Sequence, residues 1–400
     1  MFSLPDTFKE KNEDYIVVNA MKNFIKCRPN MKCKLGENRA GLIKSITDYA
    51  NKSDVAQEET LNWIDLVVRE GIKDLYIMRL TDESKALVED AEAVYDKIDE
   101  ELQKVQINHL CGNHYTEALS LVKFQVENQD TLVYTFHLCQ LVYIFDGDTD
   151  VKTRLFPTCV DIYPNEGLIV GRGKPRQNMY KYGSDGFDPK SAVKLNAEFT
   201  IQRSIQYIVN LLGLSYSGTQ EIGWYFKNRL YRLLDKYTNT PKEIETLMEQ
   251  SSGEIKSAIE IIADKICMKG NRDDITSDIM NLIEKYFSIT YEDKSIFIKG
   301  KDAYPLRIAA TDEEESKVDQ RSAREHPLQS KALFFDNKKM MQKNQICDGA
   351  VFKFRRKSKR YYEDEFKVRI TIKNNYCHIK FFEYTEEVDI QNVLRLFIGS

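Results

Sequence analysis

Apolar positions recur at helical spacing through most of the first hundred residues. Three segments before residue 70 each gather their apolar side chains on one face of a helix of period 3.6. Pro29 suits the end of the first segment and Gly71 the end of the third. Residues 72–77 have the branched and aromatic content of a short strand. We therefore expect a mainly helical N-terminal domain over residues 1–106.

The period changes to that of strands from Ala118 onward. Residues 121–126 and 132–145 are rich in β-branched and aromatic side chains, and an Asp-Gly-Asp turn follows them. Residues 158–163 and 167–172 read as two further strands joined by a tight turn. The pattern predicts an antiparallel β domain over residues 107–186.

The third segment returns to helical spacing. Apolar faces over 201–212 and 222–237 predict two amphipathic helices, and a polar turn near residue 293 suggests a short hairpin over 289–299. These features define a central helical domain with a hairpin, residues 187–300.

The last hundred residues mix both periods. Residues 351–354, 366–372 and 376–384 alternate as strands do, and 390–397 read as a short closing helix. This predicts a C-terminal α+β domain, residues 301–400, that contains a basic strand segment. The whole chain is therefore expected to belong to the α+β class.

Composition excludes several classes of protein. The 400 residues include 58 Lys and Arg against 62 Asp and Glu, a net charge of -4, and no apolar run reaches the ~18 residues of a membrane span. The eight cysteines are scattered without any Cys-x-x-Cys pair, and the N-terminus lacks a secretion pattern. We expect a cytoplasmic protein with free thiols, no cofactor and no membrane contact.

Positive charge nevertheless concentrates near the C-terminus. Residues 331–382 carry fourteen Lys and Arg against five acids. Within them, residues 353–362 combine six cations with two tyrosines, while Phe352 and Phe354 alternate with the charges. A strand here would place aromatic rings on one face and cations on the other. A second basic loop over residues 172–182 has the same character, and the two loops together would form one groove.

These two segments predict nucleic-acid binding, because cations attract phosphates and aromatic rings stack on unpaired bases. The residues expected to contact nucleic acid are Lys353, Arg355, Arg356, Lys357, Lys359, Arg360, Tyr361, Tyr362, Arg172, Lys174, Arg176 and Lys181. In the alternative interpretation the Phe residues belong to the core and Glu363–Glu365 neutralise the patch. DNA and RNA are not distinguished. The expected role is that of a non-catalytic sensor or adaptor in a larger assembly, and the Lys-, Asn- and Ile-rich composition suits a bacterial accessory protein, such as one in antiviral defence.

A short motif favours an enzyme instead. Arg321 and His326 have the spacing Arg-x4-His, which resembles the active-site motif of HEPN ribonucleases. In that family the motif lies on a helix, where the His assists proton transfer and the Arg stabilises phosphate charge. The resemblance implies a metal-independent ribonuclease. Pro327, directly after the His, departs from a helical setting.

Two further alternatives remain open. His109, Cys111 and His114 are three side chains of metal-ligating type within six residues, and a zinc site would need a fourth ligand, such as Cys27 or Cys33, or an open water position. The contrasting interpretation is an ordinary loop. Finally, 22 Tyr and 20 Phe would supply anchors for a protein partner, so a subunit devoted only to protein–protein interaction is also consistent with the sequence.

Overall fold

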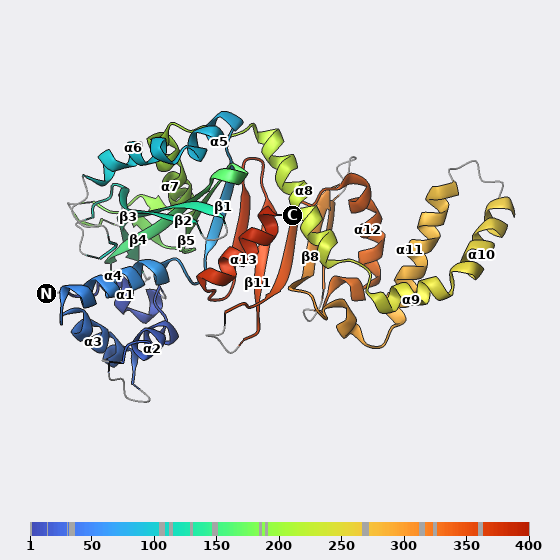
Figure 1. Cartoon of the computed structure of the whole chain (residues 1–400), viewed down its shortest axis with the longest axis horizontal. Coiled ribbons are helices and arrows are strands. Elements are labelled where there is room, and N and C mark those ends of the chain that lie inside the picture. The colour runs from blue at the N-terminus through green and yellow to red at the C-terminus, as the bar shows by residue number, and fades with distance from the viewer. Residues whose placement is uncertain are drawn as a thin grey trace. The chain divides into compact units, whose positions relative to one another are not determined.

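The computed structural model confirms the α+β class, with thirteen α-helices and twelve strands among the residues it describes. Those residues are 2–13, 15–29, 31, 37–103, 109–111, 115–128, 131–145, 151–183, 186–188, 191–265, 272–311, 317–322, 326–358 and 363–399. The chain forms two compact units (Figure 1). Unit 1 comprises Met1–Ile222, Lys357–Tyr362 and Asn374–Asn392; unit 2 comprises Gly223–Arg356, Glu363–Lys373 and Val393–Ser400. Each unit therefore joins segments that are distant in the sequence.

Unit 1 is built on an antiparallel sheet. Its strands are β1 (Asp74–Arg79), β2 (Ser120–Asn128), β3 (Leu132–Phe145), β4 (Val151–Tyr163), β5 (Leu168–Gly173), β6 (Met179–Lys181), β7 (Lys194–Leu195) and β12 (Cys377–Phe381). They pair in the order β7-β6-β3-β4-β5-β1-β12, and β2 also pairs with β3. The predicted strands over 118–182 are confirmed, as is the short strand predicted at 72–77.

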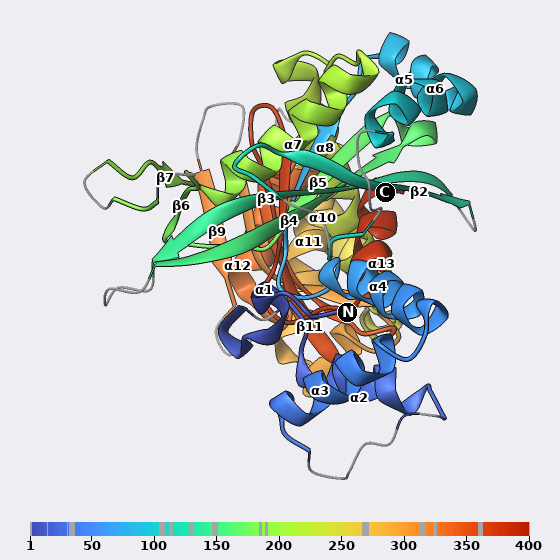
Figure 2. The ribbon, with the colours of Figure 1, turned by 90° about the vertical axis from the view of Figure 1, so that its left-hand side faces the viewer.

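Helices cover both faces of this sheet (Figure 2). They are α1 (Asp6–Lys9), α2 (Val18–Lys26), α3 (Arg39–Ala50), α4 (Asp54–Val68), α5 (Asp82–Glu89), α6 (Ala91–Leu102) and α7 (Ala197–Leu212), with short 3-10 turns at Lys11–Glu13 and Pro164–Glu166. Helices α5, α6 and α7 cover one face and α1–α4 the other. Each face has its own apolar core.

Helix α7 illustrates why the local sequence folds as it does. The Asn196 side chain accepts a hydrogen bond from the Glu198 N–H and caps the N-terminus, while Gly213, at φ 68°, ends the helix in the left-handed region. Ile201 and Ile205 face the sheet, where Gly171 and Gly173 leave room for close approach. A helix held this tightly fixes the orientation of its outer face.

Unit 2 combines a four-stranded antiparallel sheet with helices. Its strands are β8 (Ala303–Thr311), β9 (Lys317–Arg321), β10 (Gly349–Arg355) and β11 (Glu365–Ile372), in the order β9-β8-β10-β11. Its helices are α9 (Lys242–Gln250), α10 (Ser252–Lys265), α11 (Arg272–Thr290) and α12 (Ala332–Asn344), with 3-10 turns at Lys294–Phe297 and Leu328–Ser330. Helix α8 (Thr219–Tyr237) begins in unit 1 and continues in unit 2, and α13 (Glu387–Ile398) likewise belongs to both.

The predicted hairpin over residues 289–299 is wrong. Helix α11 extends to Thr290, and a 3-10 turn over Lys294–Phe297 follows it. The Lys294 ammonium donates hydrogen bonds to the carbonyl oxygens of Ser288, Ile289 and Tyr291, which caps the end of the helix. The closing helix predicted at 390–397 is confirmed as α13.

Candidate nucleic-acid interface

Alternation along β10 separates apolar from cationic side chains. Phe352 and Phe354 are fully buried, whereas Lys353 is half-buried and Arg355 is exposed. Successive strand residues point to opposite faces, so the two cations share the outer face of the unit 2 sheet. The arrangement predicted from the sequence for this strand is present.

The neighbouring strands add four more cations to that face. In register, Lys353 lies opposite Lys367 of β11, and Arg369 of β11 lies opposite Val351 of β10, which shares the face of Lys353. Val351 also lies opposite Arg307 of β8, and Arg307 opposite Arg321 of β9. Directly opposed residues of antiparallel strands project from the same face. We name the resulting set the cationic sheet face: Arg307, Arg321, Lys353, Arg355, Lys367 and Arg369.

Among the described residues, Asp319 and Glu365 place carboxylates next to cations of this face. Arg307 Nε donates to Asp319 Oδ1 at 2.7 Å, and its Nη2 donates to the second carboxylate oxygen. This guanidinium lowers the pKa of Asp319, which therefore stays ionised near neutral pH. Lys353 Nζ lies 3.3 Å from Glu365 Oε2. These two carboxylates therefore contact the cations Arg307 and Lys353 of the face.

The strand register also places two pairs of like charges directly opposite each other. Lys353 and Lys367 form one directly opposed pair, and Arg307 and Arg321 form the other. Like charges directly opposite in a sheet are destabilising, by a few tenths of a kcal/mol up to about 1 kcal/mol per pair. In each pair one cation also contacts a carboxylate of the same unit, Arg307 with Asp319 and Lys353 with Glu365, which reduces this cost.

A small apolar cluster of unit 2 restricts the positions of the strands that carry these cations. Tyr304, Leu306 and Val351 are buried together, and Ile298 packs against them. The register shifts between Val351 and Phe352, so that Leu306 is an extra residue on β8. Arg355 Nη2 donates to the Ile298 carbonyl oxygen at 3.1 Å. Backbone and side-chain contacts therefore restrict where the cations point.

The rest of the first basic segment is distributed differently. The Arg356 guanidinium lies 5.1 Å from the centre of the Phe366 ring. Lys357 is exposed, and its backbone N–H donates to Asp389 Oδ1 at 2.6 Å. Lys359, Arg360, Tyr361 and Tyr362 lie outside the described residues.

Most cations of the second basic segment, residues 172–182, form contacts within unit 1. Arg172 is only 1% exposed and lies 2.8 Å from Asp161 and 2.7 Å from Glu387. Arg176 is held by both carboxylate oxygens of Glu13. Such cations are compensated inside their own unit and are not available to phosphates.

The two remaining cations of that segment differ from each other. Lys174 donates to the Glu13 carbonyl oxygen and lies 5.0 Å from the centre of the Tyr15 ring. Lys181 is exposed on β6. Lys181 is therefore the one side chain of the four predicted there that the structure leaves on the surface.

Arg172 belongs to a layer of buried charge beneath α4 and α13. Burial alone would raise the pKa of Glu387, but the Arg172 and Arg69 guanidinium groups hold it at about 2. Arg69 in turn lies 2.9 Å from Glu387 and 2.7 Å from Glu127. This layer is a structural network in the interior of unit 1.

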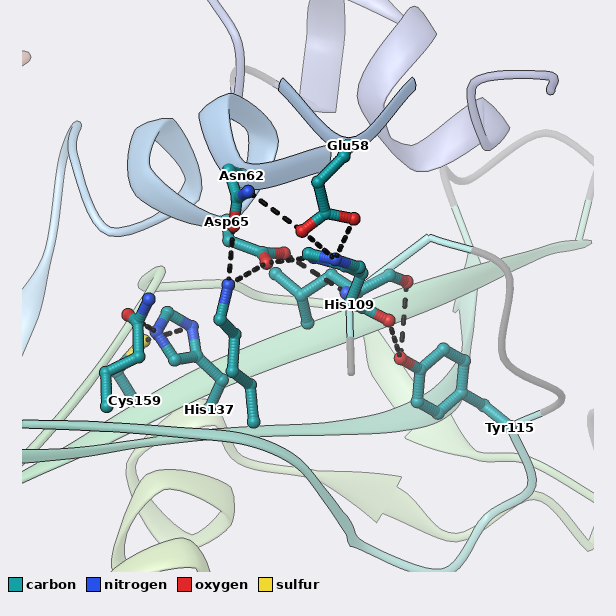
Figure 3. Close-up of polar contacts among 10 residues, drawn as sticks. Glu58, Asn62, Asp65, His109, Tyr115, His137 and Cys159 are labelled. Carbon is teal, nitrogen blue, oxygen red and sulfur yellow. Dashed lines mark hydrogen bonds and ion pairs between the residues drawn. The ribbon is translucent and has the colours of Figure 1, made fainter. Parts of the chain in front are cut away.

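The predicted metal ligands form a different arrangement (Figure 3). His109 Nδ1 lies 2.8 Å from Asp65 Oδ2, and Nε2 lies 3.2 Å from both carboxylate oxygens of Glu58. Lys123 also contacts Asp65, at 3.2 Å. Both imidazole nitrogens are thus engaged by carboxylates, which fixes the His109 side chain on α4.

The other two members of that set do not complete a site. Cys111 is buried, and burial raises the pKa of its thiol well above the usual range, which disfavours a thiolate ligand. His114 lies outside the described residues. Within the part of the chain that the structure describes, no group of three or more His, Cys, Asp or Glu could hold a metal ion.

The ribonuclease-like pair lies in a setting that differs from the HEPN family. Arg321 is the last residue of strand β9, not part of a helix, and His326 is exposed beyond it. Residues 323–325 between them are outside the described residues. The strand placement puts Arg321 on the cationic sheet face, next to Arg307.

Three cations of this face were missed from the sequence. Lys367 and Arg369 alternate with Phe366, Val368 and Ile370, so the sequence pattern alone predicts that they point outward. The position of Arg307 on this face cannot be predicted in this way, because it depends on pairing with β10, more than forty residues later.

No protein-family model and no curated protein matches this chain. Among the described helices, none combines the length and apolar character that crossing a bilayer requires.

Proposed function

We propose that this protein binds the phosphate backbone of a nucleic acid through the cationic sheet face, as an accessory component that handles nucleic acid. The observation that carries the proposal is that the register of four strands gathers six Lys and Arg side chains on one face: Arg307, Arg321, Lys353, Arg355, Lys367 and Arg369. Phosphates bound along such a face would contact several cations at once and release counterions.

The shape of the surface supports backbone contact in preference to base reading. Side chains two residues apart on a strand are separated by about 7 Å, and adjacent strands by about 5 Å, so the cations form a flat grid. Flat arrays of Lys and Arg contact phosphates and carry no direct sequence information. Binding is therefore expected to depend weakly on sequence and strongly on salt.

A salt titration tests the proposal. Affinities of the full chain for a DNA duplex, an RNA duplex and single strands are measured at several salt concentrations by fluorescence anisotropy. The variant Lys367→Ala/Arg369→Ala removes two cations from β11. It should lower affinity for the preferred nucleic acid and reduce the slope of log K against log salt by about 1 per cation removed.

A matched control uses two exposed lysines elsewhere in unit 2. Lys242 lies on α9 and Lys256 on α10, and both are exposed. Lys242→Ala/Lys256→Ala changes net charge by the same amount but leaves the cationic sheet face intact. Equal losses in the two double variants, or a wild-type chain that binds none of the nucleic acids at low salt, would refute the proposal.

A further inference from the structure

A second surface feature lies in unit 1, on the outer side of α7. A pocket of about 700 Å³ is bounded by α7, the end of β1, the first turn of α8 with the chain before it, and the turn at Asn375. Its volume falls within the range that accommodates small organic ligands. The lining residues are Met78, Phe199, Gln202, Arg203, Gln206, Tyr216, Ser217, Thr219, Ile222 and Asn375. We name this feature the α7 groove.

Four of these side chains come from one face of α7. Phe199, Gln202, Arg203 and Gln206 follow the spacing i, i+3, i+4 and i+7, so they lie side by side along the helix. The opposite face of α7, with Ile201 and Ile205, is buried against the sheet. The groove side chains are therefore presented from a rigid support.

The charge of the groove points to an anion. Arg203 is its single charged residue, and no Asp or Glu lines it. Among the described residues, no carboxylate forms an ion pair with Arg203, in contrast to Arg172 and Arg176 of the same unit. An exposed guanidinium without a carboxylate partner favours a ligand that brings negative charge.

The apolar part of the groove points to a flat ring. Phe199 is 64% exposed, so the face of its ring is open to a ligand in this groove. It lies one helical turn from Arg203, with about 5–6 Å between Cβ atoms at that spacing. Base–aromatic stacking is a recurrent mode of binding single strands, and the side-chain amide of Asn375 can bond to a base edge, whereas the Gln206 amide is bonded to Asn210 and Tyr216.

We propose that the α7 groove binds one unpaired nucleotide, with the base stacked on Phe199 and the phosphate at Arg203. The inference rests on the proposed nucleic-acid function but adds a second site with a different substrate preference. The cationic sheet face contacts backbone of any form, whereas the α7 groove accepts only a base that is not paired. The nucleotide can belong to a strand or be free, since both present the same base and phosphate.

The test compares single strands with duplexes of the same sequence, on the full chain. Phe199→Leu, which keeps apolar bulk but removes the ring, should weaken binding of an eight-nucleotide single strand by about five- to a hundredfold. Phe199→Tyr should retain wild-type affinity, because the ring remains. Arg203→Ala should weaken the single strand and reduce its salt slope by about 0.7. Duplex binding should change less than twofold in all three variants.

Controls and a second readout separate this inference from the proposed function. Val193→Ala, at another exposed apolar position of unit 1, should leave single-strand affinity unchanged. A second readout uses 4-fluorophenylalanine at position 199. If free nucleotides enter the α7 groove, adenosine monophosphate at millimolar concentration should shift the fluorine resonance. If the resonance is unchanged while the variants lose affinity for the single strand, the groove binds nucleotides only as part of a strand. Equal effects of Phe199→Leu on the affinities for duplex and single strand, or no effect on either affinity, would overturn the inference. Variants of the cationic sheet face test the proposed function independently of that result. Selective binding of an acidic, Phe-rich peptide in place of the single strand would also overturn it.

Discussion

The guanidinium group of Arg172 lies 2.8 Å from the carboxylate of Asp161, and both side chains are sealed from solvent. A positively charged residue in a basic loop is normally assigned to the surface, where a ligand can reach it. Here the opposite holds, because the strand that carries Arg172 turns it toward Asp161 and Glu387. Arg172 therefore stabilises unit 1.

Replacing Arg172 should be costly to the fold and neutral to binding. Arg172→Met leaves Asp161 buried without its cation and leaves Glu387 with Arg69 alone, which is expected to lower the free energy of unfolding by about 3–5 kcal/mol. Urea unfolding would follow Trp63, on α4 of unit 1, in a background of Trp224→Phe. Lys181→Met, on the surface of the same segment, should change stability by less than about 0.5 kcal/mol. A stable Arg172→Met protein with weakened nucleic-acid affinity would assign Arg172 to the ligand instead.

His137 should make unit 1 sensitive to mild acid. Burial, reinforced by Arg69, lowers the pKa of His137 to about 3, against about 6.5 in the unfolded chain. As pH falls below about 6.5, only the unfolded state takes up this proton, so the stability that is present above that pH declines. Between pH 7 and pH 5 the decline from this one group is about 2 kcal/mol.

The comparison of His137→Gln with wild type measures that contribution. The variant should lose about 2 kcal/mol less than wild type between pH 7 and pH 5, read by the Trp63 transition. His326→Gln, at an exposed position, should lose as much as wild type. A His137→Gln protein with unchanged pH dependence would show that His137 is protonated in the folded state.

Gly171 should tolerate no side chain. A Cβ at this position would lie 2.5 Å from Ile205 Cγ1 and 3.0 Å from Ile201 Cγ2. Gly171→Ala therefore forces α7 away from β5, at an expected cost of about 1–3 kcal/mol. Gly218→Ala is the control, because nothing lies within 4 Å of the added carbon. Thermal unfolding of the two variants distinguishes close packing from a general effect of the substitution; equal melting temperatures would contradict the packing argument.

Lys367→Glu should separate stability from binding. The new carboxylate faces Lys353 across the sheet, so an opposed pair of like charges becomes an opposite pair. Stability of unit 2 is expected to rise by about 0.2–1 kcal/mol, whereas nucleic-acid affinity falls. The reporter is Trp224, in a background of Trp63→Phe. A variant that loses stability and affinity together would indicate that Lys367 acts through the fold.

Much of the architecture was readable from the sequence, because local periodicity determines it. The alternation of Phe366, Val368 and Ile370 with Lys367 and Arg369 requires only that β11 form, after which the cations point outward. The end of α11 was not readable in this way. Ile289, Thr290 and Tyr291 have strand-like side chains, but the preceding turns of helix and the Lys294 cap extend the helix through Thr290.

The candidate site was less predictable, since it depends on pairing between distant segments. Arg307 and Arg369 share one face only because Val351 lies between them in register. The burial of Arg172 depends on Glu387, more than two hundred residues later. The α7 groove shows the same limit, because its aromatic–arginine spacing is local, whereas its walls come from β1 and the turn at Asn375.

The contribution of Asn374–Asn392 to unit 1 has a consequence for biosynthesis. On a ribosome, Arg172 and Asp161 emerge long before Glu387, the second acid that Arg172 contacts. Residues 1–222 therefore cannot complete their layer of buried charge until residues 374–392 have been synthesised. A chain that stops before Glu387 would leave the buried Arg172 guanidinium without one of its two carboxylate contacts.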